Sequence, residues 1–101
     1  MTPVVTTPAA DENIRHVDDW WMEHRPLSPH LFREELAEGL ALLADAPEVG
    51  RRYAHRGIPG LRRIVLRATR YHAYYVYDGR LVTVLSVWSS LRRRGPKLAP
   101  P

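Results

Sequence analysis

The sequence contains no cysteine and no long apolar segment. Without cysteine, the chain forms no disulfide bond and offers no thiolate as a nucleophile or a metal ligand. Its longest apolar stretches fall well short of the roughly 20 residues that a membrane-spanning helix needs. Residues 1–8 carry neither the positive charge nor the apolar run of a secretory signal. These absences predict a cytoplasmic protein that makes no membrane contact.

Acidic residues are almost absent from the second half of the chain. Residues 1–50 hold ten acidic and three basic residues, a net charge of −7, whereas residues 51–101 hold one acidic and twelve basic residues, a net charge of +11. Together these give the +4 of the whole chain. Such an asymmetry indicates a polyanionic or acidic-protein partner for the second half. The alternative is a basic surface that serves only solubility.

The length of 101 residues is enough for one small domain and too short for two. An apolar content of 45% is ordinary for a globular protein, so the chain is expected to fold. We expect a single domain over residues 1–98, followed by a frayed tail at residues 99–101.

Two amphipathic helices are predicted in the first half. Thr7-Pro8 is a hydroxyl cap followed by proline at the first helical position, and apolar residues then recur every three or four positions to about His24. Ser28-Pro29 repeats this start signal before a second helix over about residues 29–45. Because a short break joins the two helices, they are expected to form an antiparallel hairpin.

The residue period changes from 3.6 to 2 in the second half, after an irregular basic connection over residues 50–60. Strands are predicted at about residues 61–66, 71–77 and 81–88, and Asp78-Gly79 is a strong two-residue hairpin signal. A short strand is also expected within residues 1–6. The predicted fold is α+β: an N-terminal strand, then a two-helix hairpin packed on a twisted antiparallel sheet that ends in a three-stranded meander.

Several strings, in their order and spacing, resemble the ParE branch of the RelE/ParE toxin superfamily. The first half contributes Thr7-Pro8-Ala9-Ala10, Leu42-Leu43 and Ala46-Pro47-Glu48-Val49-Gly50-Arg51. The second half contributes Leu61-Arg62-Arg63, Thr69-Arg70-Tyr71-His72-Ala73-Tyr74-Tyr75, Asp78-Gly79, Val87-Trp88 and Arg92-Arg93-Arg94-Gly95-Pro96. The resemblance covers roughly residues 3–98, nearly the whole chain.

The resemblance implies the toxin of a type II toxin–antitoxin system, a growth-arresting protein associated with plasmid stabilisation. It implies a cognate antitoxin as partner, whose acidic segment wraps the toxin and neutralises it. It also implies one of two targets: ParE-like members poison DNA gyrase, and RelE-like members cut messenger RNA on the ribosome. Fold does not decide between these targets. A regulatory nucleic-acid-binding protein or an inert relative is the third alternative.

A ribonuclease needs groups that deprotonate the ribose 2′-hydroxyl, stabilise the pentacoordinate phosphate and protonate the leaving oxygen. In RelE-like enzymes, by resemblance, these are basic residues of the central strands with a C-terminal arginine and tyrosine. Arg63 matches one basic position, but Val65 and His72 occupy the other strand positions. Ser90 and Pro96 occupy the C-terminal positions. With four of the five groups missing or changed, gyrase inhibition is favoured over an enzymatic activity.

His72 is the one residue that would restore an enzyme, as an acid–base group with Arg63 or Arg70 stabilising the phosphate. The alternative is a strand histidine whose ring faces solvent. The other four histidines show no metal-ligand spacing, so neither a metal nor any other cofactor is predicted. These are His16, His24, His30 and His55.

Aromatic residues gather in the strand predicted at 71–77, and most of them are expected in the core. Alternation places the members of this strand on two faces: Tyr71, Ala73, Tyr75 and Tyr77 on one, and His72, Tyr74 and Val76 on the other. Trp20 and Trp21 cannot both face the core from consecutive helical positions, so one of them is expected to be exposed. Trp20, Tyr74 and Trp88 are candidates for contacts with a partner.

The basic residues of the second half are the main candidates for binding a target, a nucleic acid or the antitoxin. Arginine suits this role because its planar group pairs with a carboxylate or a phosphate through two hydrogen bonds. One group surrounds a strand and its turn, and the other follows the last strand. The groups are Arg62, Arg63, Arg67 and Arg70, and then Arg92, Arg93, Arg94 and Lys97. If the strand ends meet, the groups form one patch; the alternative is a field of surface salt bridges.

Overall fold

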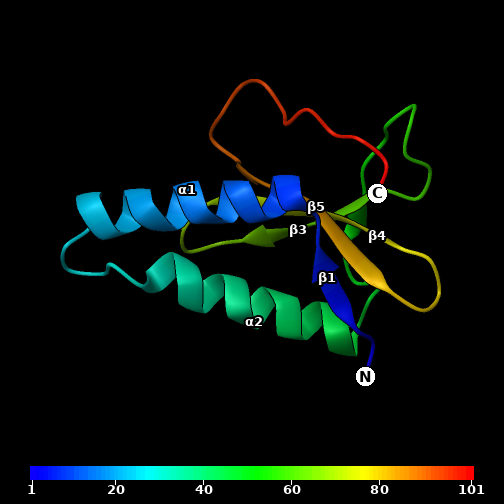
Figure 1. The fold of residues 1–101 in the computed structure, drawn as a ribbon, viewed down its shortest axis with the longest axis horizontal. Helices are drawn as coiled ribbons and strands as arrows, with labels where there is room; N and C mark the ends of the chain where they lie inside the picture. The colour runs from blue at the N-terminus through cyan, green and yellow to red at the C-terminus, as the bar shows by residue number, and fades with distance from the viewer.

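The computed structural model describes residues 1–101 (Figure 1). The helices are α1 (Pro8–His24) and α2 (Leu31–Asp45), and neither is long and apolar enough to cross a membrane. The strands are β1 (Val4–Thr6), β2 (Arg51–Arg52), β3 (Arg62–Leu66), β4 (Tyr71–Tyr77) and β5 (Val82–Ser89). The predicted α+β class is confirmed. β2 is an additional strand, inside the connection that was expected to be irregular.

α1 begins where its cap predicts. The Thr7 hydroxyl accepts a hydrogen bond from the N–H of Ala10 at 3.1 Å. Pro8 follows at the first helical position, where its missing N–H leaves no hydrogen bond unmade. Asp11 lies in the first turn, where the positive end of the helix dipole favours a carboxylate. Local sequence is therefore sufficient to set this end of the helix.

α2 begins at Leu31, so the prediction that Ser28 caps it at Pro29 is wrong. The residue before the helix is His30, whose side chain makes no capping hydrogen bond. Ser28 lies instead in two successive turns: its N–H donates to the carbonyl of Arg25, and its carbonyl accepts from the N–H of Leu31. The chain has to reverse direction between the two helices, and it does so in these two turns. Residues 25–30 are therefore not available for an earlier start of α2.

The five strands form one sheet in the order β1–β5–β4–β3–β2. The antiparallel meander of β3, β4 and β5 is as predicted, and β2 extends it at the outer edge. β1, however, runs parallel to β5, so the sheet is mixed and not wholly antiparallel. Parallel pairing requires a long connection between the two strands. Both helices and three other strands separate β1 from β5 along the chain.

The hairpin between β4 and β5 forms where Asp78-Gly79 predicts it. Four residues, not two, separate the paired positions Tyr77 and Val82. The Asp78 carboxylate accepts hydrogen bonds from the N–H groups two and three residues further on, both at 2.8 Å. Gly79 has a φ of +94°, a conformation that glycine adopts without a steric penalty. The Asp78 side chain thus supplies hydrogen bonds that stabilise a turn of four residues.

The main hydrophobic core lies between the helices and one face of the sheet (Figure 1). The β4 side chains turned toward the helices are those predicted: Tyr71, Ala73, Tyr75 and Tyr77. In β5 an irregularity in the pairing changes the alternation, so that Val84 and Val87 both face the helices while Leu85 faces away. The apolar run of β5 is therefore buried on both faces of the sheet.

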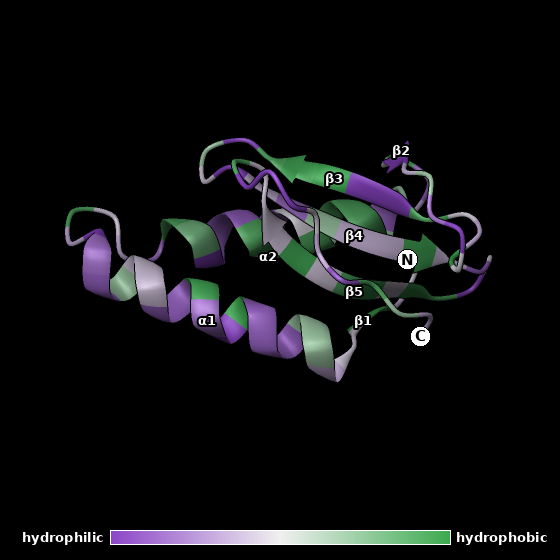
Figure 2. Ribbon diagram, turned by 90° about the horizontal axis from the view of Figure 1, so that it is seen from above, coloured by the Kyte–Doolittle hydropathy of each residue, from purple (hydrophilic) through white to green (hydrophobic).

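A smaller cluster covers the opposite face of the sheet. Its buried members are Ile58, Leu61, Tyr74 and Leu85, and Leu98 of the C-terminal segment packs against them. Figure 2 shows this segment running back across the sheet on the side away from α2. Residues 53–61 and the C-terminal segment therefore form a second layer, which the residue pattern does not predict.

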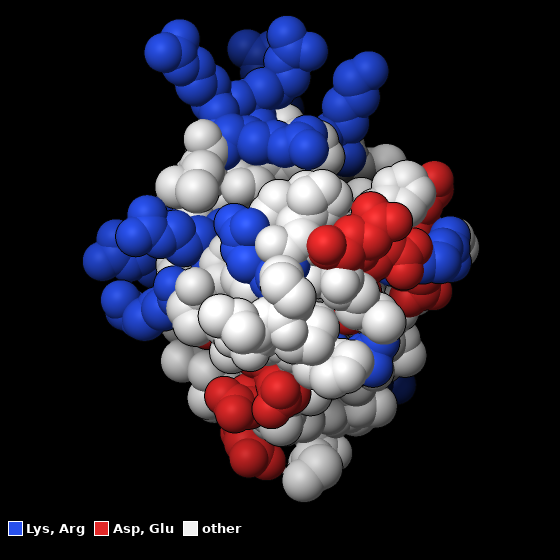
Figure 3. Space-filling view, turned by 90° about the vertical axis from the view of Figure 1, so that its left-hand side faces the viewer, with Lys and Arg blue, Asp and Glu red and all other residues white.

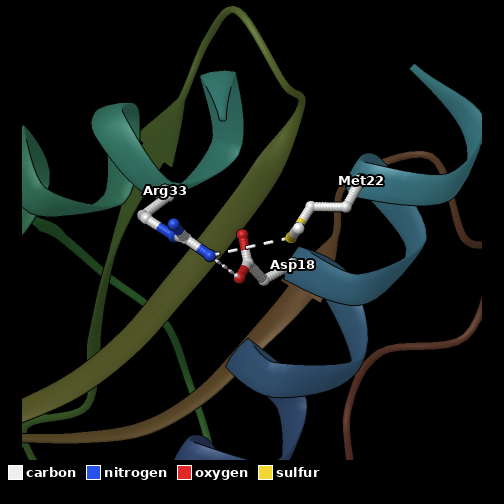
Figure 4. A network of polar contacts seen from close by, with 3 residues as sticks. All are labelled: Asp18, Met22 and Arg33. Atoms are coloured by element: carbon white, nitrogen blue, oxygen red, sulfur yellow. Dashed lines mark hydrogen bonds and ion pairs between the residues drawn. The ribbon is translucent and has the colours of Figure 1, made fainter. Parts of the chain in front are cut away.

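Two polar contacts fix the position of α2. Arg33 pairs with Asp18 of α1 at 2.6 Å (Figure 4). At the other side, Glu35 accepts hydrogen bonds from the N–H of Ala68 and from the N–H and hydroxyl of Thr69, at 2.5 to 2.9 Å. Burial disfavours the ionised carboxyl, but these three bonds outweigh it and lower the pKa of Glu35. The β3–β4 turn is thereby held against α2.

The side chain of Tyr75 joins the core to the segment that leads into β2. It is fully buried, and its hydroxyl donates to the carbonyl of Pro47 at 2.8 Å and accepts from the N–H of Gly50 at 2.9 Å. Burial raises the pKa of this hydroxyl, which keeps it protonated as a donor. A Cβ atom on residue 50 would lie 2.6 Å from the Tyr75 oxygen, so only glycine permits this approach. Tyr75 therefore determines where β2 starts.

We predict that Tyr75→Phe lowers the free energy of unfolding by about 1–3 kcal/mol, because a buried N–H and a carbonyl lose their partner. Tyr77→Phe is the matched control: the hydroxyl of Tyr77 donates to the carbonyl of Gly79 at an exposed turn. Its loss should change the free energy by about 0.5 kcal/mol or less. Urea unfolding measures both variants, and equal losses would show that the Tyr75 hydroxyl has no special structural role.

Candidate functional site

The basic residues of the second half form no salt bridge. The one ion pair in the whole chain joins Arg33 to Asp18, and both lie in the helices. The alternative of a field of surface salt bridges is therefore wrong, and the charge of +11 on residues 51–101 is not neutralised by pairing within the chain. Figure 3 shows Lys and Arg gathered at the top of the molecule, on the side of the C-terminal segment, and at its left edge. Asp and Glu form separate groups.

Part of the first predicted basic group, Arg67 and Arg70, meets the second group at one end of the sheet. The carbonyl of Arg70, in the β3–β4 turn, accepts hydrogen bonds from the N–H and the hydroxyl of Ser90, both at 2.9 Å. The turn that carries Arg67 and Arg70 therefore lies beside the start of the segment that carries Arg92. All three arginines are exposed. The structure thus joins the β3–β4 turn and the C-terminal segment into one basic surface.

Arg62 lies apart from this surface. Side chains alternate along β3, so Arg62 and Arg63 point to opposite faces of the sheet. The guanidinium of Arg62 donates to the carbonyls of Glu48 and Gly50 at 2.9 and 2.8 Å. Arg62 is therefore held by the backbone of the segment that leads into β2.

Arg63 and His72 share the face of the sheet opposite the helices. The guanidinium of Arg63 stacks on the ring of Tyr53, 4.6 Å from its centroid, and donates to the hydroxyl of Tyr74 at 3.4 Å. His72 packs edge-to-face against Tyr74, with the ring centroids 6.0 Å apart. Burial, and then the positive charge of Arg63, lower the pKa of His72. Both effects favour the neutral form of the His72 ring.

The structure brings together two of the three residues considered for a ribonuclease. Arg63 and His72 are neighbours on adjacent strands, whereas Arg70 lies in the turn with a positive φ of 65°. The Arg70 side chain makes no hydrogen bond with either of them. No three histidine or acidic side chains lie close enough together to hold a metal ion. For a ribonuclease, the arrangement therefore offers one candidate base, His72, and one cation, Arg63.

Trp88 fixes the C-terminal basic segment to the sheet. Its indole N–H donates to the carbonyl of Arg94 at 2.7 Å, and the guanidinium of Arg92 stacks on its ring, 4.5 Å from the centroid. The side chains of Arg93 and Lys97 are exposed to solvent. The segment therefore presents its charges from an ordered backbone.

The three aromatic candidates differ in their exposure. Tyr74 is only 2% exposed, so a partner cannot reach it while the second layer is in place. Trp88 is half-buried. Trp20 is 40% exposed, whereas Trp21 is buried, so the prediction that one of these two is exposed is confirmed.

Trp20 and Trp88 line a groove of about 570 Å³ between α1 and β5. Each tryptophan carries a stacked arginine, since Arg25 lies 4.7 Å from the centroid of Trp20 and Arg92 stacks on Trp88. The residue pattern does not predict this groove, because its two walls are far apart in the sequence.

The residue pattern also fails to reveal the basic strand β2. Across the antiparallel pair, Arg51 lies opposite Arg63, and Arg52 lies opposite Arg62. The only local signal is the string Arg51-Arg52-Tyr53, a basic pair followed by an aromatic residue. Two residues are too few to show the alternation of a strand.

Comparison with known proteins identifies a family match over most of the chain. The family model described as the ParE toxin of type II toxin-antitoxin system, parDE, matches residues 4–94. No curated protein sequence matches the chain. The chain is similar to solved structures of both branches of the superfamily, at identities that show the fold alone.

The chromosomal ParDE toxin–antitoxin system from P. aeruginosa matches with a TM-score of 0.68 and 16% identity, over 88% of this chain and 96% of that one. A mutant of the E. coli toxin RelE in the free state matches with a TM-score of 0.60 and 22% identity, over 89% and 84%. The intact E. coli RelBE toxin–antitoxin complex matches with a TM-score of 0.61 and 23% identity, over 91% and 100%.

We predict that Arg63→Gln raises the pKa of His72, because a positive charge that disfavours the imidazolium form is removed. NMR titration of the His72 ring protons measures the shift. Arg67→Gln, at an exposed position beyond the end of β3, is the matched control and should leave that pKa in place. A His72 pKa that stays the same or falls in Arg63→Gln would contradict the coupling.

Proposed function

Because this chain belongs to the family of ParE toxins of type II toxin–antitoxin systems, we propose that it inhibits DNA gyrase and that direct binding of a cognate antitoxin neutralises it. The proposal is of a binding toxin, not of an enzyme. Its contacts with the target come from the basic surface made by the β3–β4 turn and the C-terminal segment.

The observation that carries this proposal is the ordered and unpaired C-terminal segment. Trp88 holds it through one hydrogen bond and one stacked arginine, and no carboxylate of the chain neutralises it. A surface of this kind recognises an acidic or phosphate-bearing partner, because arginine forms paired hydrogen bonds with both groups. The absence of most RelE-like catalytic residues also favours binding over cleavage.

An antitoxin fits the same surface. The related structures include the P. aeruginosa ParDE system and the E. coli RelBE complex. An acidic, extended antitoxin segment would neutralise the exposed arginines and cover them. A segment that folds only on binding is also open to proteolysis when free, which would release the toxin.

A second candidate is a ribosome-dependent messenger-RNA endonuclease. The specific observation in its favour is that His72 and Arg63 lie on adjacent strands and on one face of the sheet, with the pKa of His72 lowered. His72 would take the proton of the 2′-hydroxyl, and Arg63 would stabilise the negative charge that develops on the phosphate. Neither residue replaces the C-terminal tyrosine and arginine that RelE-like enzymes are expected to use.

Induced expression without antitoxin, with parallel measurement of the DNA damage response and of messenger-RNA integrity, tests the proposal. We predict filamentous cells with an induced damage response and intact messages. Rapid arrest of translation with cleaved messages would contradict gyrase inhibition, and loss of that cleavage in His72→Ala would support the endonuclease.

In the same assay, charge reversal at residues 92–94, with each arginine replaced by glutamate, should abolish toxicity. The control reverses Arg15, Arg56 and Arg80, three arginines that are exposed and lie outside the β3–β4 turn and the C-terminal segment. It should remain toxic at an equal expression level. Equal loss in both variants would mean that overall charge, and not this surface, is responsible.

A further inference from the structure

The pairing of β2 with β3 places four arginines in two cross-strand pairs at the edge of the sheet. Arg51 and Arg63 share the face opposite the helices, and Arg52 and Arg62 share the other face. In an antiparallel pair the Cβ atoms of opposite residues lie about 4.5–5.5 Å apart, and like charges on opposite residues destabilise the pair. No carboxylate forms an ion pair with any of the four. Figure 2 shows the hydrophilic colouring of β2 and of the adjoining half of β3. The fold therefore concentrates positive charge at this edge without compensation.

The four arginines are not equivalent. Two are fixed: Arg62 by the carbonyls of Glu48 and Gly50, and Arg63 by its stacking on Tyr53. The other two, Arg51 and Arg52, are exposed and make no side-chain hydrogen bond. Two guanidinium groups thus stay in place while two can adjust to a ligand.

The surroundings extend this basic edge. Residues 52–56 and 58–61 line an open groove of about 670 Å³, and Arg52, Tyr53, His55 and Arg56 are among them. A Cβ atom on Gly95 would lie 3.5 Å from the Tyr53 hydroxyl, so the C-terminal segment passes beside the ring on which Arg63 stacks. Positive groups therefore line a path from β2 to the C-terminal segment.

We propose that this arginine edge, formed by Arg51, Arg52, Arg62 and Arg63, is a binding site for the phosphodiester backbone of nucleic acid. Successive phosphates supply repeated negative charges that offset the like-charge pairs. The guanidinium groups of Arg51 and Arg52 make no hydrogen bond within the chain, so each is free to pair with a phosphate. The tyrosine beneath Arg63 is covered by the guanidinium and does not stack a base, so recognition is independent of sequence. This site goes beyond the proposed function and stands whether or not gyrase is the target.

Fluorescence anisotropy with the full-length protein tests the site, using a labelled DNA duplex and a labelled single-stranded RNA, each of about 20 nucleotides or base pairs and of random sequence. The variant is Arg51→Gln with Arg52→Gln. We expect its affinity to fall by about tenfold or more. The slope of log affinity against log salt should fall in magnitude by about 2 for the duplex, since each phosphate that the variant no longer neutralises accounts for about 0.9.

The matched control is Arg15→Gln with Arg80→Gln, which removes the same charge at exposed positions in α1 and in the β4–β5 turn, outside the two cross-strand pairs. Its salt slope should stay near that of the original protein. A loss confined to the duplex or to the RNA assigns the site to that polymer. Absence of binding by the original protein, or equal losses in the two double variants, overturns the proposal.

An edge strand rich in charge can also serve only to prevent pairing with other chains. In that case the Arg51/Arg52 variant would self-associate in analytical ultracentrifugation while its affinity for nucleic acid stayed unchanged, and the proposal would fail. Arg51→Lys with Arg52→Lys keeps the positive charge but removes the planar guanidinium that forms two hydrogen bonds with a phosphate. This variant should have an affinity for nucleic acid between those of the original protein and the Arg51→Gln, Arg52→Gln variant. Because no gyrase is present in these measurements, their failure leaves gyrase inhibition to be judged separately.

Discussion

The hydroxyl of Tyr75 is the contact on which the organisation of the basic half depends. Tyr75 is fully buried, and its hydroxyl donates a hydrogen bond to the carbonyl of Pro47 and accepts one from the N–H of Gly50, the last residue before β2. This contact ties the end of α2 to the sheet and allows Arg62 to bind the carbonyls of the same segment. Together with the two hydrogen bonds of Arg62, it holds the backbone just before β2, where the pairing of Arg51 with Arg63 begins. A buried polar contact in the core thus sets the spacing of charges on the surface.

The distribution of charge follows the two layers of the fold. The acidic residues lie almost entirely in the first half of the chain, which holds both helices, whereas the second layer on the opposite face of the sheet is basic. Because a single ion pair exists and both its members are helical, the basic face keeps its full charge. Aromatic rings order this face: Tyr53 carries Arg63, and Trp88 carries Arg92. An antitoxin, a gyrase–DNA surface and a nucleic-acid backbone all present the negative groups that such a face would bind.

The sequence predicts those features that depend on neighbouring residues. The Thr7 cap places the start of α1, and the alternation of β4 correctly assigns Tyr75 to the core and His72 to the other face. Features that depend on distant contacts are not predicted. The parallel pairing of β1, the short strand β2 and the C-terminal layer arise from residues that meet only in the folded chain. The basic residues could be proposed as a site, but their division into fixed and free groups could not, because it follows from stacking and carbonyl contacts.

Family membership and the unpaired basic surface lead to one central claim, that this protein acts by binding gyrase. Supercoiling of relaxed plasmid by purified gyrase, with increasing amounts of the purified protein, measures this without other cellular components. We predict that supercoiling falls in a dose-dependent manner and that prior complexation with the antitoxin restores it. Full gyrase activity at excess protein, together with cleavage of ribosome-bound messages in a translating extract, would contradict the account and identify His72 and Arg63 as groups of an endonuclease.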